Sequence, residues 1–443
     1  MIRIKNIAIM GMGYVGLTLS VILAKKGFKT YGVEINKDVV NKLKRGEPHF
    51  QEKGLKALLK HQQMIGNLVI QEKLKDEDID AYIISVGTPL LKGEKKPNTE
   101  YIKNVLKDVG KHMKKGALVA LRSTVPVGLS REQAIPAIEE ASGLKIGKDF
   151  SFIFAPERTA EGKALIELES NPQIIGGYDE NSVNLGMTIF EKITPTVIVV
   201  SSIEGAEMLK IIDNTSRDIR FAYCNEIAMI CEKLNLDAYE LIKAANIHYP
   251  RNDIAIPSPG VGGACLSKDP HILVSFAEKK GYAPELIKEG RKINEKIPGA
   301  IVARLKNKLK DMGKDIESAK IFIVGFAFKG QPETSDLRDS TTIWFLDELK
   351  KVISMKNIFG FDPVISEEEL KGLGINTCKS IEEGCVDADV ILFMNNHQSY
   401  LNIDPFDICE KMNKEAIFYD AWRMFEKSLF EDLKEVHYMG VGL

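Results

Sequence analysis

The chain is short of cysteine, of net charge and of long apolar runs. Its six cysteines in 443 residues are too few for a disulfide-rich scaffold, and no two form a Cys-x-x-Cys pair, so no disulfide framework or thiolate metal site is expected. With 60 basic and 62 acidic residues the net charge is −2, which disfavours nucleic-acid binding. No apolar run approaches the roughly 18 residues of a membrane span. These absences predict a cytoplasmic globular protein with no metal, no nucleic-acid partner and no membrane partner.

The first 200 residues alternate between strand-like and helix-like segments. Amphipathic stretches that predict helices include residues 17–27 and 37–46. Short apolar runs that predict buried strands lie at residues 4–10, 30–34, 80–87, 116–124 and 150–156. This alternation is typical of a parallel sheet covered by helices on both faces.

The middle and the carboxyl-terminal parts have different patterns. From about residue 203 to 308 strand signals disappear, and residues 204–234 predict one unusually long helix. A loop rich in Pro and Gly at residues 248–270 interrupts the helices. Strand–turn patterns resume from residue 319. We therefore predict three regions, 1–200, 201–310 and 311–443, with α/β folds at both ends and helices between them.

A glycine-rich turn follows the first predicted strand and opens the first predicted helix. Gly11, Gly13 and Gly16 have the spacing that lets a backbone approach a pyrophosphate at a helix N-terminus. Glu34 follows Gly16 by 18 residues, where a carboxylate accepts hydrogen bonds from a ribose. Because this carboxylate would repel a 2′-phosphate, the motif predicts a Rossmann-like domain that binds NAD in preference to NADP.

A second cluster surrounds Cys265, in the glycine-rich loop at residues 262–269. Lys268 adds positive charge that favours a thiolate, and Asp269 could orient or deprotonate a water. A buried, inert cysteine is the competing interpretation. The other five cysteines lie in apolar or helical contexts and are interpreted as structural.

Polar side chains on the long predicted helix form a third cluster. Helical spacing places Lys210 and Asn214 on one face, with Arg217 nearby. Such a stripe is usually a solvated face, but the apolar residues around Lys210 make a functional site a second possibility.

Polar groups also follow several predicted strands. Thr88, Thr124 and Glu157 follow three strands of the first region, and the carboxyl ends of strands are where α/β sheets bind ligands. In the third region Lys329 and Arg338 follow the first strand. This pair suits either a diphosphate or a surface salt-bridge patch.

Six ordered motifs make the chain resemble the UDP-glucose/GDP-mannose dehydrogenase family over essentially its whole length. They are GMGYVG, STVPVG, APER, AEMLKIIDNTSRDIRFAYCNEIA, PGVGGACLSKDP and FKGQPETSDLRDS. The resemblance implies an α/β protein of two Rossmann-like doubly wound domains, one for NAD and one for UDP, joined by a central helical region that forms a homodimer. It also implies an NAD-dependent, four-electron oxidation of the C6 hydroxyl of a UDP-sugar.

The resemblance assigns roles to individual residues. Cys265 would capture the intermediate aldehyde, with Lys210 and Asn214 at the reacting oxygen and Glu157 and Asp269 at the hydrolytic water. The NAD residues would be Gly11, Gly13, Tyr14, Val15, Gly16, Glu34, Thr88, Thr124 and Arg338. The UDP-sugar residues would be Arg158, Thr159, Lys210, Asn214, Arg217, His248, Arg251, Gly262, Phe328, Lys329 and Arg423.

Three features bear on the sugar. The motifs most resemble the N-acetylhexosamine branch, which implies UDP-N-acetyl-D-mannosamine, with UDP-N-acetylglucosamine and UDP-glucose as alternatives. Ala264 stands where that branch often has His, and residues 248–251 are one residue longer than usual. Arg122 precedes the STVPVG motif, where an acidic or amide residue is common.

Two other classes of protein share part of this pattern. A two-electron β-hydroxyacid-type dehydrogenase would have the first domain but no Cys265 loop and no second nucleotide unit. A catalytically silent nucleotide-binding protein would not need the Lys210, Asn214, Cys265 and Asp269 set, which is intact here.

Overall fold

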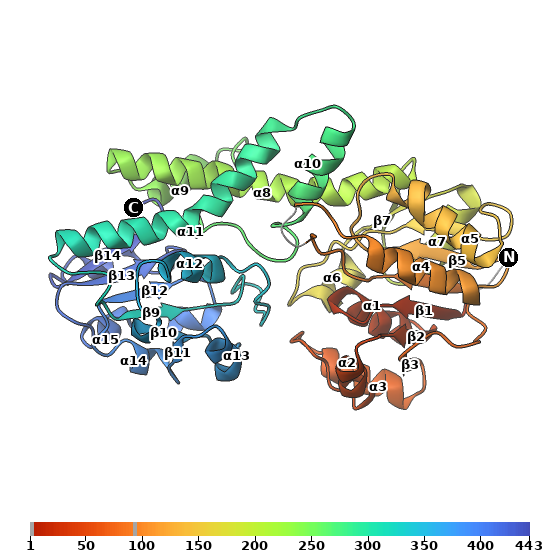
Figure 1. Cartoon of the computed structure of the whole chain (residues 1–443), viewed down its shortest axis with the longest axis horizontal. Coiled ribbons are helices and arrows are strands. Elements are labelled where there is room, and N and C mark those ends of the chain that lie inside the picture. Colours follow the sequence, from red (N-terminus) through yellow and green to blue (C-terminus); the bar gives the residue numbers. More distant parts are fainter. Residues whose placement is uncertain (1–3, 92–94) are drawn as a thin grey trace. The chain divides into compact units, whose positions relative to one another are not determined.

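The computed structural model describes residues 4–91 and 95–443, which fold into two compact units. The first unit runs to Asp213 and includes His271–Ala283; the second comprises Asn214–Pro270 and Pro284–Leu443. The boundary falls within helix α8 (Ile203–Leu234), drawn in yellow-green in Figure 1. This helix confirms the long helix predicted at residues 204–234.

An eight-stranded sheet forms the centre of the first unit, in the order β3-β2-β1-β4-β5-β6-β7-β8. Neighbouring strands are parallel, except that β6 and β7 are antiparallel. The apolar runs predict β1, β2, β4, β5 and β6 but not β3, β7 or β8; the edge strand β8 is only three residues long and largely exposed. The bounds are β1 Asn6–Met10, β2 Lys29–Val33, β3 Leu68–Gln71, β4 Ala81–Ile84, β5 Leu118–Leu121, β6 Ser151–Phe154, β7 Gln173–Gly177 and β8 Val197–Val199.

Helices cover both faces of this sheet. Successive residues of a strand point to opposite sides, so each strand contributes to an apolar cluster on each face. Ile7 and Ile9 of β1 lie in one buried apolar cluster with residues of α1 (Tyr14–Lys25). Ala8 and Met10 lie in another, with residues of α4 (Glu100–His112). The remaining helices of this unit are α2 Lys37–Lys44, α3 Leu55–Met64, the π-helix η1 Ser130–Ala134, α5 Ile135–Ser142, α6 Ala164–Ser170 and α7 Glu180–Phe190.

The second unit holds a parallel six-stranded sheet in the order β11-β10-β9-β12-β13-β14. This order repeats that of β3-β2-β1-β4-β5-β6 in the first unit. Ile321 and Ile323 of β9 lie in one buried cluster, and Phe322 and Val324 lie in another, so this sheet is also covered on both faces. The bounds are β9 Ile321–Val324, β10 Ile358–Phe361, β11 Asn376–Thr377, β12 Val390–Phe393, β13 Ala416–Asp420 and β14 Val436–Gly440, with α12 Thr341–Leu349, η2 Met355–Asn357, α13 Glu367–Gly372, α14 Ile381–Gly384, η3 Gln398–Asn402, α15 Pro405–Cys409 and η4 Lys427–Phe430.

Helices form the part of the chain from β8 to β9, and no strand is present in this stretch, all of which lies in the described range 95–443. They are α8, α9 (Ala238–Asn246), α10 (Asp269–Lys279) and α11 (Glu285–Asp311). The predicted two-domain α/β architecture with a helical centre is therefore confirmed. Among the helices of residues 4–91 and 95–443, none combines the length and the apolar character that a bilayer span requires.

The carboxyl terminus is fastened to both long helices of the second unit. Arg304 of α11 donates to Glu232 of α8 at 2.5 Å and to the carbonyl of Gly440 at 2.8 Å, and it also donates to the carbonyl of Leu443. One guanidinium thus serves a carboxylate and two backbone acceptors.

Candidate active site

The glycine-rich turn between β1 and α1 has the shape that a dinucleotide requires. Gly11 adopts a φ of +90°, which favours glycine, and a side chain at Gly16 would overlap the carbonyl oxygen of Gly11. A Cβ atom at Gly13 would meet no described atom within 4 Å. The backbone at Gly13 is therefore open to a pyrophosphate, as the spacing of the glycines predicts.

The groups around this turn fit NAD. Helix α1 begins at Tyr14, after an N-cap glycine that supplies no side-chain acceptor, so its first N–H groups suit a phosphate. Glu34, directly after β2, accepts the N–H of Met12 at 3.0 Å and that of Asn36 at 2.9 Å. Its carboxylate is thereby fixed at the end of the second strand, where the ribose hydroxyls of NAD would lie.

Tyr14 is tied to the loop after β6 rather than left exposed. Its hydroxyl donates to Glu52 and accepts the N–H of Gly162 at 2.9 Å. Burial, followed by the bond to Glu52, raises the pKa of Tyr14 far above its ordinary value, so the phenol stays neutral. Tyr14 and its neighbour Val15 thus occupy the first turn of α1, close to the open backbone at Gly13.

Polar groups gather at the carboxyl ends of β4, β5 and β6. The hydroxyl of Thr88, after β4, donates to the carbonyl of Thr124, after β5, at 2.7 Å. Glu157, after β6, accepts the N–H groups of Arg158 and Thr159 at 2.8 and 2.7 Å. Three loops far apart in the sequence are thus placed along one edge of the sheet, as predicted from the strand ends.

Arg122 and Glu157 form a buried ion pair at this edge, which sequence reasoning missed. Both side chains are almost fully buried, and the guanidinium contacts the carboxylate at 2.5 and 3.0 Å. Burial opposes ionisation of Glu157, but Arg122 and the N–H of Thr159 outweigh it and hold its pKa below the ordinary value. The unusual Arg122 next to the STVPVG motif is explained by this pairing.

Two carboxylates at the start of α8 hold the end of the STVPVG motif and the residues that follow it. Glu207 is fully buried and accepts the N–H of Gly128 at 2.5 Å and that of Ser130 at 2.9 Å, and Glu204 pairs with Arg131 at 2.6 Å. Burial raises the pKa of Glu207 to about 7, although the two N–H groups oppose this. Lys210, three residues after Glu207, is also buried.

Arg158, predicted to bind a sugar nucleotide, forms an ion pair with Asp213 of α8 at 2.8 Å within the first unit. Both side chains are partly exposed, so the pair contributes little to stability and can be rearranged by a ligand.

The cysteines separate into two groups. All six lie in the described residues, and Cys265 alone is exposed. Burial raises the pKa of Cys224 and of Cys409 to about 12, and it also raises the pKa of Cys231, Cys378 and Cys385. Burial thus disfavours the thiolate at these five cysteines, which fits the structural role predicted for them, and leaves Cys265 as the accessible thiol.

Asn214 joins two of the predicted site residues in the second unit. Its amide nitrogen donates to Asp269 at 2.5 Å, and its amide oxygen accepts from Arg217 at 2.6 Å. Asp269 is fully buried at the start of α10, and Lys268 lies 3.5 Å from its carboxylate. The N–H of Asp269 donates to the carbonyl of Cys265 at 2.9 Å, so the carboxylate lies one turn from the thiol.

The cysteine loop fits against the segment after β9. The N–H of Gly263 donates to the carbonyl of Asp339 at 2.9 Å, and a side chain at Gly262 would overlap that same oxygen. Gly263 has a φ of +83°, and a side chain there would overlap the ring of Phe328. The structure thus places Gly263 against Phe328 and Gly262 against the carbonyl of Asp339; Lys329 follows Phe328 in the sequence, and Arg338 pairs with Asp336.

The remaining predicted substrate residues lie elsewhere in the second unit. His248 and Arg251 are exposed in the loop before the cysteine, and the Arg251 guanidinium lies 5.8 Å from the centre of the Tyr249 ring. Arg423 is buried and pairs with Asp237, the N-cap of α9, at 2.8 and 3.0 Å. Its terminal nitrogens therefore already have acceptors within the protein.

Models of three domains of one known family match the chain one after another. Models of the UDP-glucose/GDP-mannose dehydrogenase family match residues 5–194 as the NAD binding domain, 204–296 as the central domain and 322–427 as the UDP binding domain. The chain belongs to this family. It is an NAD-dependent nucleotide-sugar dehydrogenase, and its cofactor is NAD.

Similar proteins cover almost all of the chain. A UDP-N-acetyl-D-mannosamine dehydrogenase from Pyrococcus horikoshii is 32% identical over 93% of this chain and 94% of its own length. One from Methanocaldococcus jannaschii is 33% identical over 96% of this chain and 94% of its own. A solved structure of the UDP-D-ManNAc dehydrogenase from Pyrococcus horikoshii is 30% identical, covers 99% of both chains and has a TM-score of 0.89.

Within residues 4–91 and 95–443 there is no group of three or more His, Cys, Asp or Glu side chains that could hold a metal ion.

Substitutions at Gly13 and Gly16 separate cofactor binding from folding. Gly16→Ala is expected to lower the free energy of unfolding by about 1–3 kcal/mol, because its methyl group overlaps Gly11. Gly13→Ala has room for its methyl group, so the unfolding midpoint should stay at the wild-type value. NAD affinity should nevertheless fall about tenfold or more, since that methyl group keeps the pyrophosphate from the backbone.

Thermal unfolding and calorimetric NAD titration of both variants check this. Unchanged NAD affinity in Gly13→Ala, or equal destabilisation by the two substitutions, would contradict it.

Proposed function

We propose that the chain is a UDP-N-acetyl-D-mannosamine 6-dehydrogenase that oxidises the C6 hydroxyl of its substrate to a carboxylate with two molecules of NAD. The observation that carries this proposal is the setting of Cys265, an exposed thiol one turn before the Asp269 carboxylate that Asn214 holds. A two-electron dehydrogenase has no use for such a thiol, whereas a reaction that must retain an aldehyde does.

The first unit would hold the cofactor. The open backbone at Gly13, the start of α1 and the fixed carboxylate of Glu34 would hold the pyrophosphate and ribose, and Thr88 and Thr124 would lie beside the nicotinamide. Bound NAD would accept two electrons in each of the two oxidations.

In the first oxidation the C6 alcohol becomes an aldehyde and its hydroxyl proton leaves. Lys210, buried on α8, would hold the reacting oxygen and exchange its proton. Asn214, one turn further along α8, would hold the same oxygen or a water with its amide group. The resemblance to the family supports these two roles.

Cys265 would then capture the aldehyde. Its Sγ atom forms a bond to C6, and the carbonyl oxygen takes a proton to give a thiohemiacetal. The second oxidation removes two electrons and leaves a thioester. Because the carbon stays bonded to the protein, the aldehyde is not released between the two oxidations.

Hydrolysis of the thioester regenerates the thiol. Asp269, fully buried, would accept a proton from the attacking water, and the Cys265 thiolate would leave. Glu157 would help to hold that water. Its oxygens already accept bonds from Arg122, Arg158 and Thr159, which favours a fixed acceptor over a proton carrier.

The choice of sugar rests on the relatives and on donor chemistry. Two relatives at 32% and 33% identity are UDP-N-acetyl-D-mannosamine dehydrogenases. The acetamido carbonyl of such a substrate needs a hydrogen-bond donor, and the residues carried over from the family are rich in donors. Those residues are Arg158, Thr159, Arg217, His248, Arg251, Gly262, Phe328, Lys329 and Arg423.

Replacement of the nucleophile should stop the reaction halfway. With Cys265→Ser, NADH released per UDP-sugar consumed should fall from two to at most one, because a serine hydroxyl has no low-pKa anion to capture the aldehyde. Cys231→Ser, at a buried cysteine of α8, is the matched control and should still give two NADH per sugar. Wild-type NADH yield from Cys265→Ser would remove the thiol from the mechanism.

A substrate panel tests the sugar assignment. We expect kcat/KM to be highest for UDP-N-acetylmannosamine, then UDP-N-acetylglucosamine, then UDP-glucose. A site built to hydrogen-bond an acetamido group rejects analogues that lack it by up to about 10⁴-fold. If UDP-glucose has the highest kcat/KM, the branch is wrong although the two-step mechanism stands.

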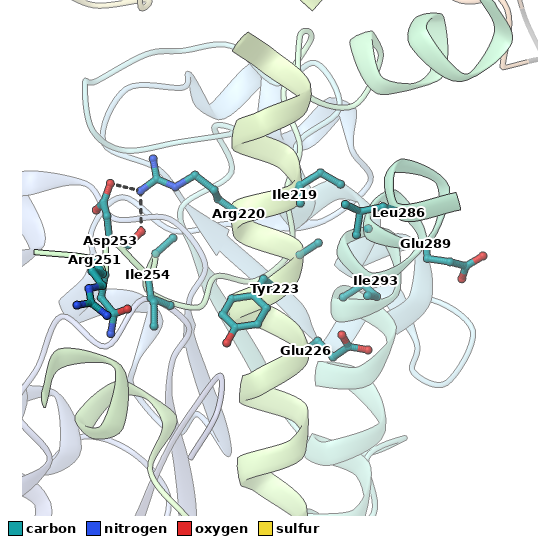
Figure 2. Close-up of a pocket in the computed structure, with 14 residues that line it drawn as sticks. Ile219, Arg220, Tyr223, Glu226, Arg251, Asp253, Ile254, Leu286, Glu289 and Ile293 are labelled. Atoms are coloured by element: carbon teal, nitrogen blue, oxygen red, sulfur yellow. Dashed lines mark hydrogen bonds and ion pairs between the residues drawn. The ribbon is translucent and has the colours of Figure 1, made fainter. Parts of the chain in front are cut away.

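We also propose that the active protein is a homodimer that associates through α8. A cavity of about 470 Å³ in the second unit is lined by α8, residues 251–255 and the first turns of α11, as Figure 2 shows. Its walls are mostly apolar, and Tyr223 on α8 is 53% exposed. A second copy of α8 would cover such a face.

The exposed part of this face is smaller than the apolar pattern of α8 predicts. Ile219, Phe221, Ala222, Ile227, Met229 and Ile230 suggest a surface on more than one side of the helix. Ile227 and Met229 instead pack against the core of the second unit, and Ala222 is buried. Ile230 and Tyr223 remain exposed, and they lie two helical turns apart on the same side of α8. The candidate contact surface is therefore that one side of the helix.

Light scattering can test the dimer with a matched pair of variants. Tyr223→Glu should shift the mass from two chains to one and reduce activity, because it buries a charge in the contact. Tyr101→Glu, on α4 and also 53% exposed, should leave the mass at two chains. A wild-type monomer with full activity would refute the homodimer.

A further inference from the structure

Arg291 of α11 is among the largest fully buried side chains of the described residues, with 1% of its surface exposed. It contacts Asp218 of α8, which is completely buried, at 2.7 Å. Asn294 donates to the same carboxylate oxygen at 2.9 Å and to the carbonyl of Asp218 at 2.9 Å. A buried charge pair is retained only where its geometry is well satisfied, and this one has several partners.

The other acceptors of Arg291 are backbone carbonyls on both sides of Cys265. One terminal nitrogen donates to the carbonyl of Val261 at 2.6 Å, and the other, which also contacts Asp218, donates to the carbonyl of Leu266 at 3.0 Å. These carbonyls belong to residues four before and one after the cysteine. One guanidinium therefore links the backbone on both sides of Cys265 to α8 and α11.

We propose that Arg291 is a positioning residue for the nucleophile: by holding the carbonyls of Val261 and Leu266, it fixes where the Cys265 thiol lies relative to α8. The inference rests on the proposed function in one respect, that Cys265 is the nucleophile. It follows from the contacts of Arg291 within the second unit.

The proposed chemistry depends on the position of the thiol when it captures the aldehyde for the second oxidation. The thiol must reach C6 of an aldehyde and then hold the thiohemiacetal in place for the second oxidation. A displacement of about 1 Å can lower the rate of such a step about 100-fold. The first oxidation does not involve the thiol, so a loosened loop should impair the second oxidation selectively.

Lysine is the informative replacement at position 291. Arg291→Lys keeps a positive charge beside Asp218, but a single ammonium cannot serve Asp218 and two carbonyls in the fork geometry of a guanidinium. The control is Arg304→Lys. Arg304 lies on the same helix and also serves a carboxylate on α8 and two backbone carbonyls, but these are at the carboxyl terminus.

The experiment follows NADH release from UDP-N-acetylmannosamine with hydroxylamine present to trap free aldehyde. For Arg291→Lys we expect kcat for the complete oxidation to fall about 10- to 100-fold with KM nearly unchanged. NADH per sugar should fall from two toward one as trapped aldehyde accumulates. Arg304→Lys should give two NADH per sugar at wild-type kcat, even if its unfolding midpoint falls.

Iodoacetamide gives a readout that does not depend on the substrate. In the native protein it should modify Cys265, because the other five cysteines are buried. We expect its rate constant to differ at least about threefold from wild type in Arg291→Lys and to stay unchanged in Arg304→Lys, because thiol reactivity follows the local surroundings. If Arg291→Lys does not fold, the double variant Asp218→Asn/Arg291→Gln leaves no buried charge and is tested in the same way.

Wild-type kcat, NADH yield and alkylation rate in a folded Arg291 variant would overturn the proposal. The same changes in Arg304→Lys would also overturn it, because they would reflect general loosening of α8 and α11. A wild-type protein that yields one NADH per sugar would instead refute the proposed function, and the alkylation rates would still decide the role of Arg291.

Discussion

Parallel strands bring their carboxyl ends to one edge of a sheet, and both units of this protein depend on that constraint. In each sheet a carboxylate directly follows the second strand along the chain. Glu34 accepts the N–H of Met12 in the first unit, and Asp362, after β10, accepts those of Phe326 and Ala327 in the second. The second sheet thus keeps the arrangement of the dinucleotide turn, with Gly325 and Gly330 at its first and last glycine positions and Ala327 at the middle one. Because both oxygens of Asp362 accept backbone N–H groups, this carboxylate holds the backbone around it in place.

Buried charged side chains then hold the loops that follow the strands. A charge removed from water must be paired, and the partner must stay in place. Glu157 is held by Arg122 at the end of β6, and the loop around Cys265 is held by Arg291. Glu207 accepts the backbone N–H groups of Gly128 and Ser130, and burial nevertheless raises the pKa of its carboxyl to about 7. Each of these groups connects a loop of the site to a rigid helix or strand.

Features that depend on neighbouring residues could be predicted from the sequence. The glycine turn, the long helix and the central strands of both sheets are of this kind, and so is the exposed cysteine in a glycine-rich loop. Pairings across long separations could not be predicted. Arg122 and Glu157 are 35 residues apart and Arg291 and Asp218 are 73 apart, so nothing in either local sequence identifies the partner. A lone arginine in an amphipathic helix resembles a solvated residue, and only packing shows that Arg291 is buried.

The separation of the cysteines into one exposed and five buried thiols has a consequence for damage by peroxide. Peroxide attacks thiolates, and burial keeps the other five cysteines in the thiol form. Conversion of Cys265 to a sulfenic acid would remove the proposed nucleophile while leaving the packed core of both units untouched. A small thiol could reverse that change, but further oxidation to a sulfinic acid could not be undone in this way. Thiol oxidation is therefore concentrated on the atom that the proposed chemistry requires.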